Sequence, residues 1–230
     1  MSSYAAYTGS RAGFLEGLRP LDLNEMLAAA KPRRVATHGV MTHQGHPADR
    51  LFMLTEGRAR YFFVTEEGRK IVLHWLVPGD AFGGAALLSR PSRYLVSTET
   101  VMDCRLLVWE RAALLRLSAR HPRILHNALL IASDYLAWYL SAHVGLTCRT
   151  ARQRLASVLV TLALTVGRKV PRGFELDITN EDLANAAAVT PFTTSRQLSE
   201  WQRRGTVVKT RGKLLLRSPD TLLHENGVRA

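Results

Sequence analysis

Short apolar runs separated by turn signals fill the first half of the chain. The runs at 50–55, 58–65 and 70–77 are rich in aromatic and β-branched residues, so each is a predicted strand. A further strand is predicted at 104–109, before the texture changes. The spacing of the runs is typical of an antiparallel barrel or sandwich. The turn signals between them are Glu56-Gly57, Glu66-Glu67-Gly68 and Pro78-Gly79-Asp80.

After residue 110 the apolar positions follow a helical period. Between Pro122 and Leu146 they recur at alternating spacings of four and three, which predicts one long helix with a heptad seam. The seam is either one half of a two-stranded dimer or a face packed on the chain's own barrel. A second apolar stripe on another face, at Ile124, Ile131 and Leu140, favours the dimer. The seam positions are Leu125, Leu129, Ala132, Leu136, Tyr139, His143 and Leu146.

The C-terminal third predicts a helix, a loop, a strand and then two short helices. The first helix covers 151–166, the loop 168–173 and the strand 174–178. Thr179 is a predicted N-cap for a helix at 180–187, and Thr190-Pro191 fits the cap and first position of a helix that runs to about Arg204. Two helices joined by a turn of about three residues form a predicted helix-turn-helix. Short strands at 207–209 and 214–216 would then make a wing.

Charge agrees with this assignment. The chain has 230 residues, 47% of them hydrophobic, and a formal net charge of +12, so a polyanionic partner is expected for a globular protein. Residues 147–230 hold 14 Lys and Arg against 7 acidic residues, a net +7. The smaller part of the chain therefore carries more than half of the positive excess.

Composition also excludes several classes of protein. Cys104 and Cys148 have no neighbouring cysteine at metal-ligand spacing, which excludes a cysteine zinc site and favours a reducing compartment. With neither a signal-like segment nor an uninterrupted apolar span, we expect a cytoplasmic protein with no membrane partner. Phosphate-loop, zinc-protease and nucleophile-elbow motifs are missing from the sequence, so we do not expect an enzyme.

Four short motifs occur in a fixed order along the chain. They are His43-Gln44-Gly45, Leu51-x-x-Leu54-x-x-Gly57, Pro78-Gly79-Asp80-x-Phe82-Gly83, and Ile178-Thr-x-Glu-x-Leu-Ala184 with Ser195-Arg196. With these motifs, the chain from about Leu21 to Leu223 resembles the CRP/FNR family of bacterial transcription regulators. The resemblance implies an α+β fold: a cyclic-nucleotide-binding-like β-roll (jelly roll), a long dimerisation helix and a winged helix-turn-helix that reads a two-fold symmetric DNA site. It implies an N-terminal extension at 1–20, an effector domain at 21–120, a dimerisation helix and hinge at 121–148, and a DNA-binding domain at 149–230.

At the positions of the family's ligand pocket, the residues of this chain differ from those of the members that bind cyclic nucleotides. Those members hold the ribose with a Glu after Phe-Gly and the phosphate with an Arg-Ser pair, whereas this chain has Gly84 and Arg93-Tyr94. Arg93 remains able to meet an anion. We therefore expect a degenerate or repurposed pocket and predict no cofactor. Its candidate residues are Gly83, Gly84, Arg93, Tyr94, Tyr139 and Leu140.

Other effectors known in the family are disfavoured as well. An iron–sulfur centre needs an N-terminal cysteine cluster, and the first cysteine here is Cys104. His38, His43 and His46 are spaced five and three residues apart, which does not define a haem or metal site. We interpret these three as incidental histidines.

The resemblance also implies which residues meet DNA. A family Glu near the start of the recognition helix is replaced by Phe192, which either contacts a thymine methyl or packs in the domain core. Arg196 is the expected reader of a guanine. Thr193 and Ser195 complete the expected base-reading set with Phe192 and Arg196. The expected phosphate contacts are Thr179, Thr190, Arg203, Arg204, Lys209, Arg211 and Lys213.

Two functional hypotheses follow. The first is a homodimeric, sequence-specific transcription regulator that binds an inverted repeat in double-stranded DNA, with RNA polymerase as a further candidate partner. Its effector, if there is one, is unidentified. The alternative is a receptor module for a small ligand, such as a cyclic nucleotide, an anion or haem, that acts through a protein partner. A salt series separates them, because DNA binding weakens steeply with added salt.

Overall fold

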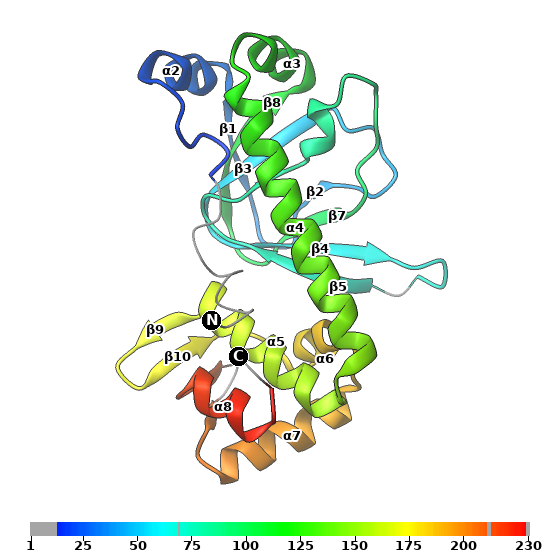
Figure 1. The fold of residues 1–230 in the computed structure, drawn as a ribbon, viewed down its shortest axis with the longest axis vertical. Helices are drawn as coiled ribbons and strands as arrows, with labels where there is room; N and C mark the ends of the chain where they lie inside the picture. The colour runs from blue at the N-terminus through cyan, green and yellow to red at the C-terminus, as the bar shows by residue number, and fades with distance from the viewer. Residues whose placement is uncertain (1–12, 69, 211–212, 229–230) are drawn as a thin grey trace. The chain divides into compact units, whose positions relative to one another are not determined.

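The computed structural model describes residues 13–68, 70–210 and 213–228, and the chain divides into two compact units. The first unit ends at Tyr135 and the second begins at Leu136, so the division falls within the long helix α4 (Arg123–Cys148). Figure 1 shows the elements of both units, coloured along the chain.

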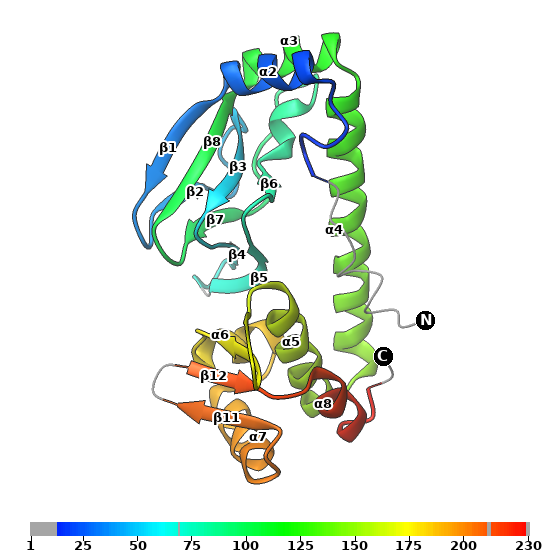
Figure 2. The same cartoon turned by 90° about the vertical axis from the view of Figure 1, so that its left-hand side faces the viewer.

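The first unit is a roll of two four-stranded antiparallel sheets. One has the order β1-β8-β3-β6 and the other the order β2-β7-β4-β5 (Figure 2). The strands are β1 (Lys31–Val35), β2 (Val40–Thr42), β3 (Arg50–Glu56), β4 (Ala59–Val64), β5 (Lys70–Leu76), β6 (Ala81–Phe82), β7 (Ser97–Thr100) and β8 (Cys104–Glu110).

Strands β3 and β8 are apolar on both faces because both faces are covered. Phe52 and Leu106 belong to the core between the two sheets. On the opposite faces of the same two strands, Leu51 and Trp109 belong to a second core. This core lies under the helices α2 (Pro20–Ala29), α3 (Arg111–Arg120) and the start of α4. Alternate residues of a strand point to opposite faces, so a strand buried on both sides needs a nearly continuous apolar run.

The segment before α2 holds the start of α4 to this second core. The Phe14 ring packs edge-on against Trp109, with centroids 5.7 Å apart. Buried Asn127 on α4 donates through Nδ2 to the carbonyl oxygens of Phe14 and Glu16, at 3.0 and 2.8 Å. Asn127 therefore ties the start of α4 to the same segment that packs on Trp109.

An ion cluster lies on the β2-β7-β4-β5 sheet. Buried Glu99 accepts from Arg60 Nε at 2.7 Å and also pairs with Lys70 Nζ. The Arg60 guanidinium lies over the Trp75 ring at 5.7 Å from its centroid, and the Lys70 ammonium over the Phe62 ring at 4.1 Å. Burial opposes ionisation, but the two cations outweigh it and lower the pKa of Glu99 below its usual range.

The second unit continues with the later turns of α4 and a helix-turn-helix backed by a small sheet of order β11-β12-β10-β9. Its core includes Leu155 and Leu159 of α5, Leu183 of α6, and Leu198 and Trp201 of α7. Its elements after α4 are α5 (Ala151–Thr165), β9 (Arg168–Val170), β10 (Gly173–Leu176), α6 (Asn180–Ala187), α7 (Pro191–Arg203), β11 (Val207–Thr210), β12 (Lys213–Leu216) and α8 (Pro219–Glu225).

The predicted strands, the long helix, the two short helices and the wing are all confirmed, with ends that shift by one or two residues. The prediction of a loop at 168–173 was wrong in part: β9 pairs with β10, and only Pro171 and Arg172 turn between them. Helices α2, α3 and α8 were not predicted. No helix among the residues described is both long and apolar enough to cross a membrane.

Candidate nucleic-acid interface

Helix α6 begins at the cap that the sequence predicts. Thr179 Oγ1 accepts from the backbone N–H of Asp182 at 3.0 Å and donates to its carboxylate at 2.9 Å. The hydroxyl group that we expected to meet a phosphate is thus engaged in capping. Leu183, Ala184 and Ala187 are buried, and the small side chains of the two alanines let α6 and α7 pack closely.

The turn between the two helices is set by a non-glycine residue in the left-handed region. Ala188 has a φ of 50° and ends α6. The N–H of Val189 returns to the carbonyl of Ala184 at 3.0 Å, as in a Schellman motif. Thr190 then caps α7 by accepting from the N–H of Thr193 at 3.1 Å, with Pro191 in the first position. Its hydroxyl also meets that of Thr193 at 3.0 Å.

The inner face of α7 is defined by residues three and four positions apart. Leu198 and Trp201 fill the core, together with Thr194 and Gln197. Within the described residues, Thr194 Oγ1, Gln197 Oε1 and Trp201 Nε1 are buried without a hydrogen-bond partner. This face is occupied by packing, so only the opposite face of α7 is open to a partner.

The outer face of α7 presents three of the four predicted base-reading residues to solvent. Phe192 is 75% exposed, so the alternative of a core position for its ring was wrong. Ser195 and Arg196 are also exposed. Thr193 is half-buried and its hydroxyl group belongs to the cap. The structure thus brings Phe192, Ser195 and Arg196 together on one face.

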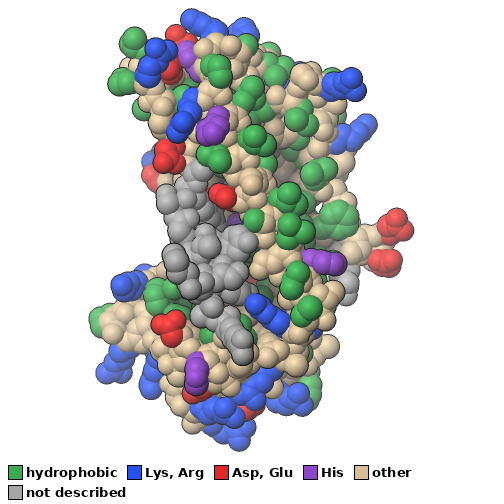
Figure 3. All heavy atoms as spheres, in the orientation of Figure 1, with side chains coloured by type: hydrophobic (Ala, Val, Ile, Leu, Met, Phe, Trp, Pro, Cys, Tyr) green, Lys and Arg blue, Asp and Glu red, His purple; other side chains and the backbone are tan. Residues whose placement is uncertain are grey.

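The predicted phosphate contacts fall into two groups. Arg203 and Lys209 are exposed, and neither forms an ion pair with any residue the structure describes. Arg204 instead pairs with Glu200 at 2.5 Å, and Lys213 with Glu175 at 3.0 Å. Arg211 lies outside the described residues. Figure 3 shows Lys and Arg side chains gathered at the end of the second unit where Figure 1 places α7.

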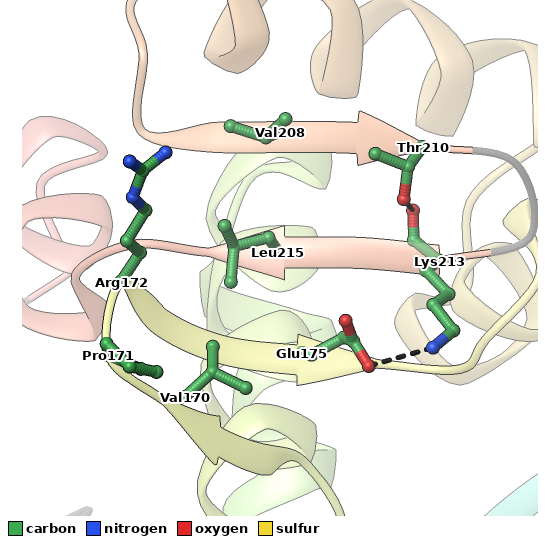
Figure 4. Close-up of a pocket in the computed structure, with 8 residues that line it drawn as sticks. All are labelled: Val170, Pro171, Arg172, Glu175, Val208, Thr210, Lys213 and Leu215. Carbon is green, nitrogen blue, oxygen red and sulfur yellow. Dashed lines mark hydrogen bonds and ion pairs between the residues drawn. The ribbon is translucent and has the colours of Figure 1, made fainter.

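Glu175 offsets the positive charge of two basic side chains on the wing sheet. It accepts from Arg168 at 2.6 Å as well as from Lys213, and these two hydrogen bonds hold its pKa below the usual range. Figure 4 shows Lys213 reaching across from β12 to Glu175 on β10. The same face has a shallow hollow of about 320 Å³, whose apolar floor is formed by Val170, Val208 and Leu215.

Four candidate pocket residues lie in the first unit. Gly83 has a φ of 81°, and a Cβ there would meet the Tyr94 ring, so these two residues are neighbours. Gly84 is exposed, with open space where a side chain would begin. Exposed Arg93 donates to the carbonyl of Gly45. Tyr139 and Leu140 belong to the second unit, and Leu140 is exposed.

Tyr94 is a structural anchor. Its buried hydroxyl group accepts from the N–H of Arg50 at 3.0 Å and donates to the carbonyl of the same residue at 2.9 Å. Burial raises the pKa of Tyr94 to about 12. Where cyclic-nucleotide binders have a serine for the ligand, this chain thus has a side chain already committed to its own backbone.

Metal and redox ligands are sparse. Cys104 is buried and Cys148 exposed, both as free thiols. The rings of His43 and His46 lie 5.1 Å apart. In the parts of the chain that the structure covers, no three His, Cys, Asp or Glu residues are grouped to hold a metal ion.

The predicted seam along α4 is exposed at nearly every position. Leu129 and Leu136 are 69% and 61% exposed, whereas Ile124 on the second stripe is buried against the roll. Figure 3 shows hydrophobic side chains along the path of α4. Leu125, Ala132, His143 and Leu146 are exposed too, and Tyr139 is half-buried. Within the first unit, the seam residues Leu125, Leu129 and Ala132 are therefore not packed on the chain's own barrel.

Two arginines of α5 contact both helices of the helix-turn-helix, and neither was predicted from the sequence. Arg154 on α5 donates to carbonyls at the end of α6, and Arg152 reaches Glu200 on α7 at 3.2 Å. Basic residues on an amphipathic helix give no sequence signal for such roles, because their acceptors lie more than thirty residues away.

Comparison with known proteins gives the same two parts in the same order. The cyclic nucleotide-binding domain family matches residues 32–121, and the Crp-like helix-turn-helix domain family matches residues 153–225.

The relatives are transcription regulators and not enzymes. The CRP-like cAMP-activated global transcriptional regulator of Mycobacterium tuberculosis is 24% identical over 209 residues, which cover 90% of this chain and 92% of that one. The nitrogen fixation regulation protein FixK of Azorhizobium caulinodans is 27% identical over 212 residues, covering 90% and 83%. The structure of FixK2 from Bradyrhizobium japonicum shares the fold, with a TM-score of 0.72 at 20% identity over 86% of this chain and 96% of that one. With its nucleotide-binding-type roll and Crp-like helix-turn-helix, this chain belongs to the CRP/FNR family of transcription regulators.

Proposed function

We propose that two copies of this chain bind one inverted-repeat DNA site, each placing α7 in the major groove. The observation that carries this proposal is the division of α7 into a packed inner face and an exposed outer face with Phe192, Ser195 and Arg196. An α-helix fits the major groove, where the four base pairs are distinguishable. The half-sites would lie about one helical turn apart.

Arg196 and Phe192 supply different kinds of base recognition. The Arg196 guanidinium, which has no ion pair within the described residues, suits the O6 and N7 acceptors of a guanine. Phe192 offers only apolar contact, so its partner is a thymine methyl group. We therefore expect each half-site to contain a guanine and a thymine within reach of one helical turn.

Arg203 and Lys209 are our proposed main phosphate contacts. Both are exposed cations beside the end of α7 and the start of the wing, without an acidic partner among the residues described. Arg204 and Lys213 are already paired with carboxylates and contribute less. Phosphate contacts position a protein on DNA without reading sequence.

The exposed apolar stripe on α4 supports a dimer. A seam with heptad spacing buries itself against a second copy of the same helix. An exposed row of leucines on a monomer is otherwise an aggregation liability. We place Leu129 and Leu136 at the centre of the contact, since they are strongly exposed.

We propose that the roll does not bind a cyclic nucleotide and that its effector, if there is one, is a different ligand. Gly84 provides no acceptor for a ribose, and the hydroxyl group of Tyr94 is committed to Arg50. Any effector would act by favouring one arrangement of the two units, which requires different affinities for the two states. The bound dimer would act on RNA polymerase, as the family resemblance implies.

The test is selection of bound sites from a randomised duplex pool by purified, ligand-free protein at two salt concentrations. We expect an inverted repeat with a guanine and a thymine in each half-site, and steep loss of binding with salt. If only sequence-blind, salt-sensitive binding is recovered, the proposal of a constitutive reader is wrong. A small-ligand receptor that acts through a protein partner then becomes the better hypothesis.

A further inference from the structure

One guanidinium group in the second unit donates hydrogen bonds to three backbone carbonyls. Arg154 on α5 donates from Nε to the carbonyl of Ala187 at 3.0 Å and from Nη2 to that of Ala188 at 3.0 Å. Its Nη1 donates to the carbonyl of Arg149 at 2.9 Å. These three acceptors come from two places far apart in the sequence.

Two of the three carbonyls lie at the turn between α6 and α7. The last carbonyls of a helix lack intrahelical partners and carry a partial negative charge, so a cation is stabilising there. Ala188 has a φ of 50°, a conformation that costs a non-glycine residue free energy. Ala188 is also exposed, so side-chain packing does not hold it. The hydrogen bonds from Arg154 are what stabilise this turn from outside.

The third carbonyl lies at the elbow between α4 and α5. Arg149 continues α4 by donating its N–H to the carbonyl of Gly145 at 3.1 Å. Thr150 then begins α5 with a capping box that includes Gln153. A single side chain therefore connects the end of the proposed dimerisation helix with Ala187 and Ala188, which lie three and two residues before Thr190, the cap of α7.

This arrangement needs arginine. The guanidinium has five N–H donors in a planar fork, so it can meet three carbonyls in different directions at once. A lysine keeps the charge but concentrates its donors at one point on a flexible stem. Arg154→Lys therefore changes the geometry of donation and leaves the net charge unchanged.

We propose that Arg154 is a positioning residue that ties the α4–α5 elbow to the helix-turn-helix turn and so fixes where α7 begins. The inference rests on the DNA-binding function proposed above. Arg154 itself contacts no base in this scheme. It acts through the turn at Ala188. Its replacement should therefore lower the affinity for the specific DNA site and leave the affinity for DNA of random sequence unchanged.

The first measurement is affinity of the full-length chain for the selected site and for a scrambled duplex. Arg154→Lys should lower affinity for the selected site about tenfold and change that for scrambled DNA by less than about twofold. Arg168→Lys is the matched control. It makes the same change on β9, where the partner is the carboxylate of Glu175, so both affinities should stay as in the wild type.

The second measurement tests the route. Glycine adopts the left-handed conformation without strain, so Ala188→Gly should restore most of the site affinity to Arg154→Lys. Hydrogen exchange of the free protein should quicken at residues 188–194 in Arg154→Lys and return towards the wild-type rate in the double variant.

The outcomes are separable. Unchanged site affinity and unchanged exchange in Arg154→Lys would overturn the proposal, as would a loss that Ala188→Gly does not rescue. If the wild-type chain selects no site at all, the proposed DNA-binding function fails. In that case the exchange rates at 188–194 still decide whether Arg154 holds the turn.

Discussion

Phe192 and Arg196 lie one helical turn apart on the exposed face of α7, so an aromatic ring and an unpaired guanidinium group are neighbours on the surface. Neither side chain forms a hydrogen bond or an ion pair with the rest of the described chain. The pair thus presents one apolar and one strongly donating group to a partner.

Replacing the contacted thymine by uracil removes one methyl group from the DNA and nothing from the protein. Burial of a methyl contributes about 0.8 kcal/mol, so wild-type affinity should fall about fourfold. Phe192→Ala should bind the thymine and uracil duplexes equally, because the ring that senses the methyl is gone. Titration of the four protein–DNA combinations measures this. The control places uracil outside the half-site, and an equal effect there would contradict the prediction.

Arg196→Ala should reduce discrimination at one base pair by about 1–3 kcal/mol, whereas Lys209→Ala should weaken binding to all sequences alike. Lys213→Ala should have a smaller effect than Lys209→Ala, since the Lys213 ammonium already pairs with Glu175. Salt titrations check this: the slope should fall by about one for Lys209→Ala and by less for Lys213→Ala. Equal slopes would mean that the ion pair with Glu175 opens on DNA.

Leu129→Asp should give a monomer, because it places a carboxylate in the apolar seam of α4. Sedimentation velocity at micromolar concentration measures the state. Leu95→Asp is the matched control, since Leu95 is 82% exposed and lies outside α4. A dimer that survives Leu129→Asp would place the interface elsewhere.

The stability of the first unit should fall in acid through Glu99. The folded pKa of this carboxyl group is below its ordinary value of 4.5, so the stabilisation is complete above that value and is lost as pH falls through the folded pKa. Glu99→Gln should cost about 1.5–3 kcal/mol at pH 7, because Arg60 and Lys70 lose their carboxylate.

Urea unfolding of both proteins at pH 7 and pH 3.5 measures the effect of Glu99. The difference between wild type and variant should shrink at the lower pH. A difference that stays constant would show that Glu99 does not titrate in this window.

Elements with a local signal were predictable from the sequence. Thr190-Pro191 marks the start of α7 because a hydroxyl cap and a proline satisfy the same requirement, the orphan N–H groups of a first turn. The exposed seam followed from the spacing of Leu129 and Leu136 in the same way. The exposed face of α7 needed only the helical period once α7 was located.

Features that depend on distant partners gave no such signal. Helix α3 begins at Arg111, and Glu110 before it makes no side-chain cap, so the start of this helix has no capping signal in the sequence. Strand β9 has three residues and exists because β10 pairs with it. The commitment of Tyr94 to Arg50, and of Lys213 to Glu175, joins residues 44 and 38 positions apart. Because of these pairings, the Tyr94 hydroxyl group and the Lys213 ammonium group already have partners within the chain.

The outer face of α7 supports nothing inside the chain, and this has an evolutionary consequence. A change at Phe192 or Arg196 removes no core contact, so it should alter the free energy of unfolding by no more than about 0.5 kcal/mol. If α7 reads bases as proposed, single substitutions on this face change the preferred DNA site without compensating changes elsewhere. Leu198 and Trp201 preserve the fold beneath while the outer face changes.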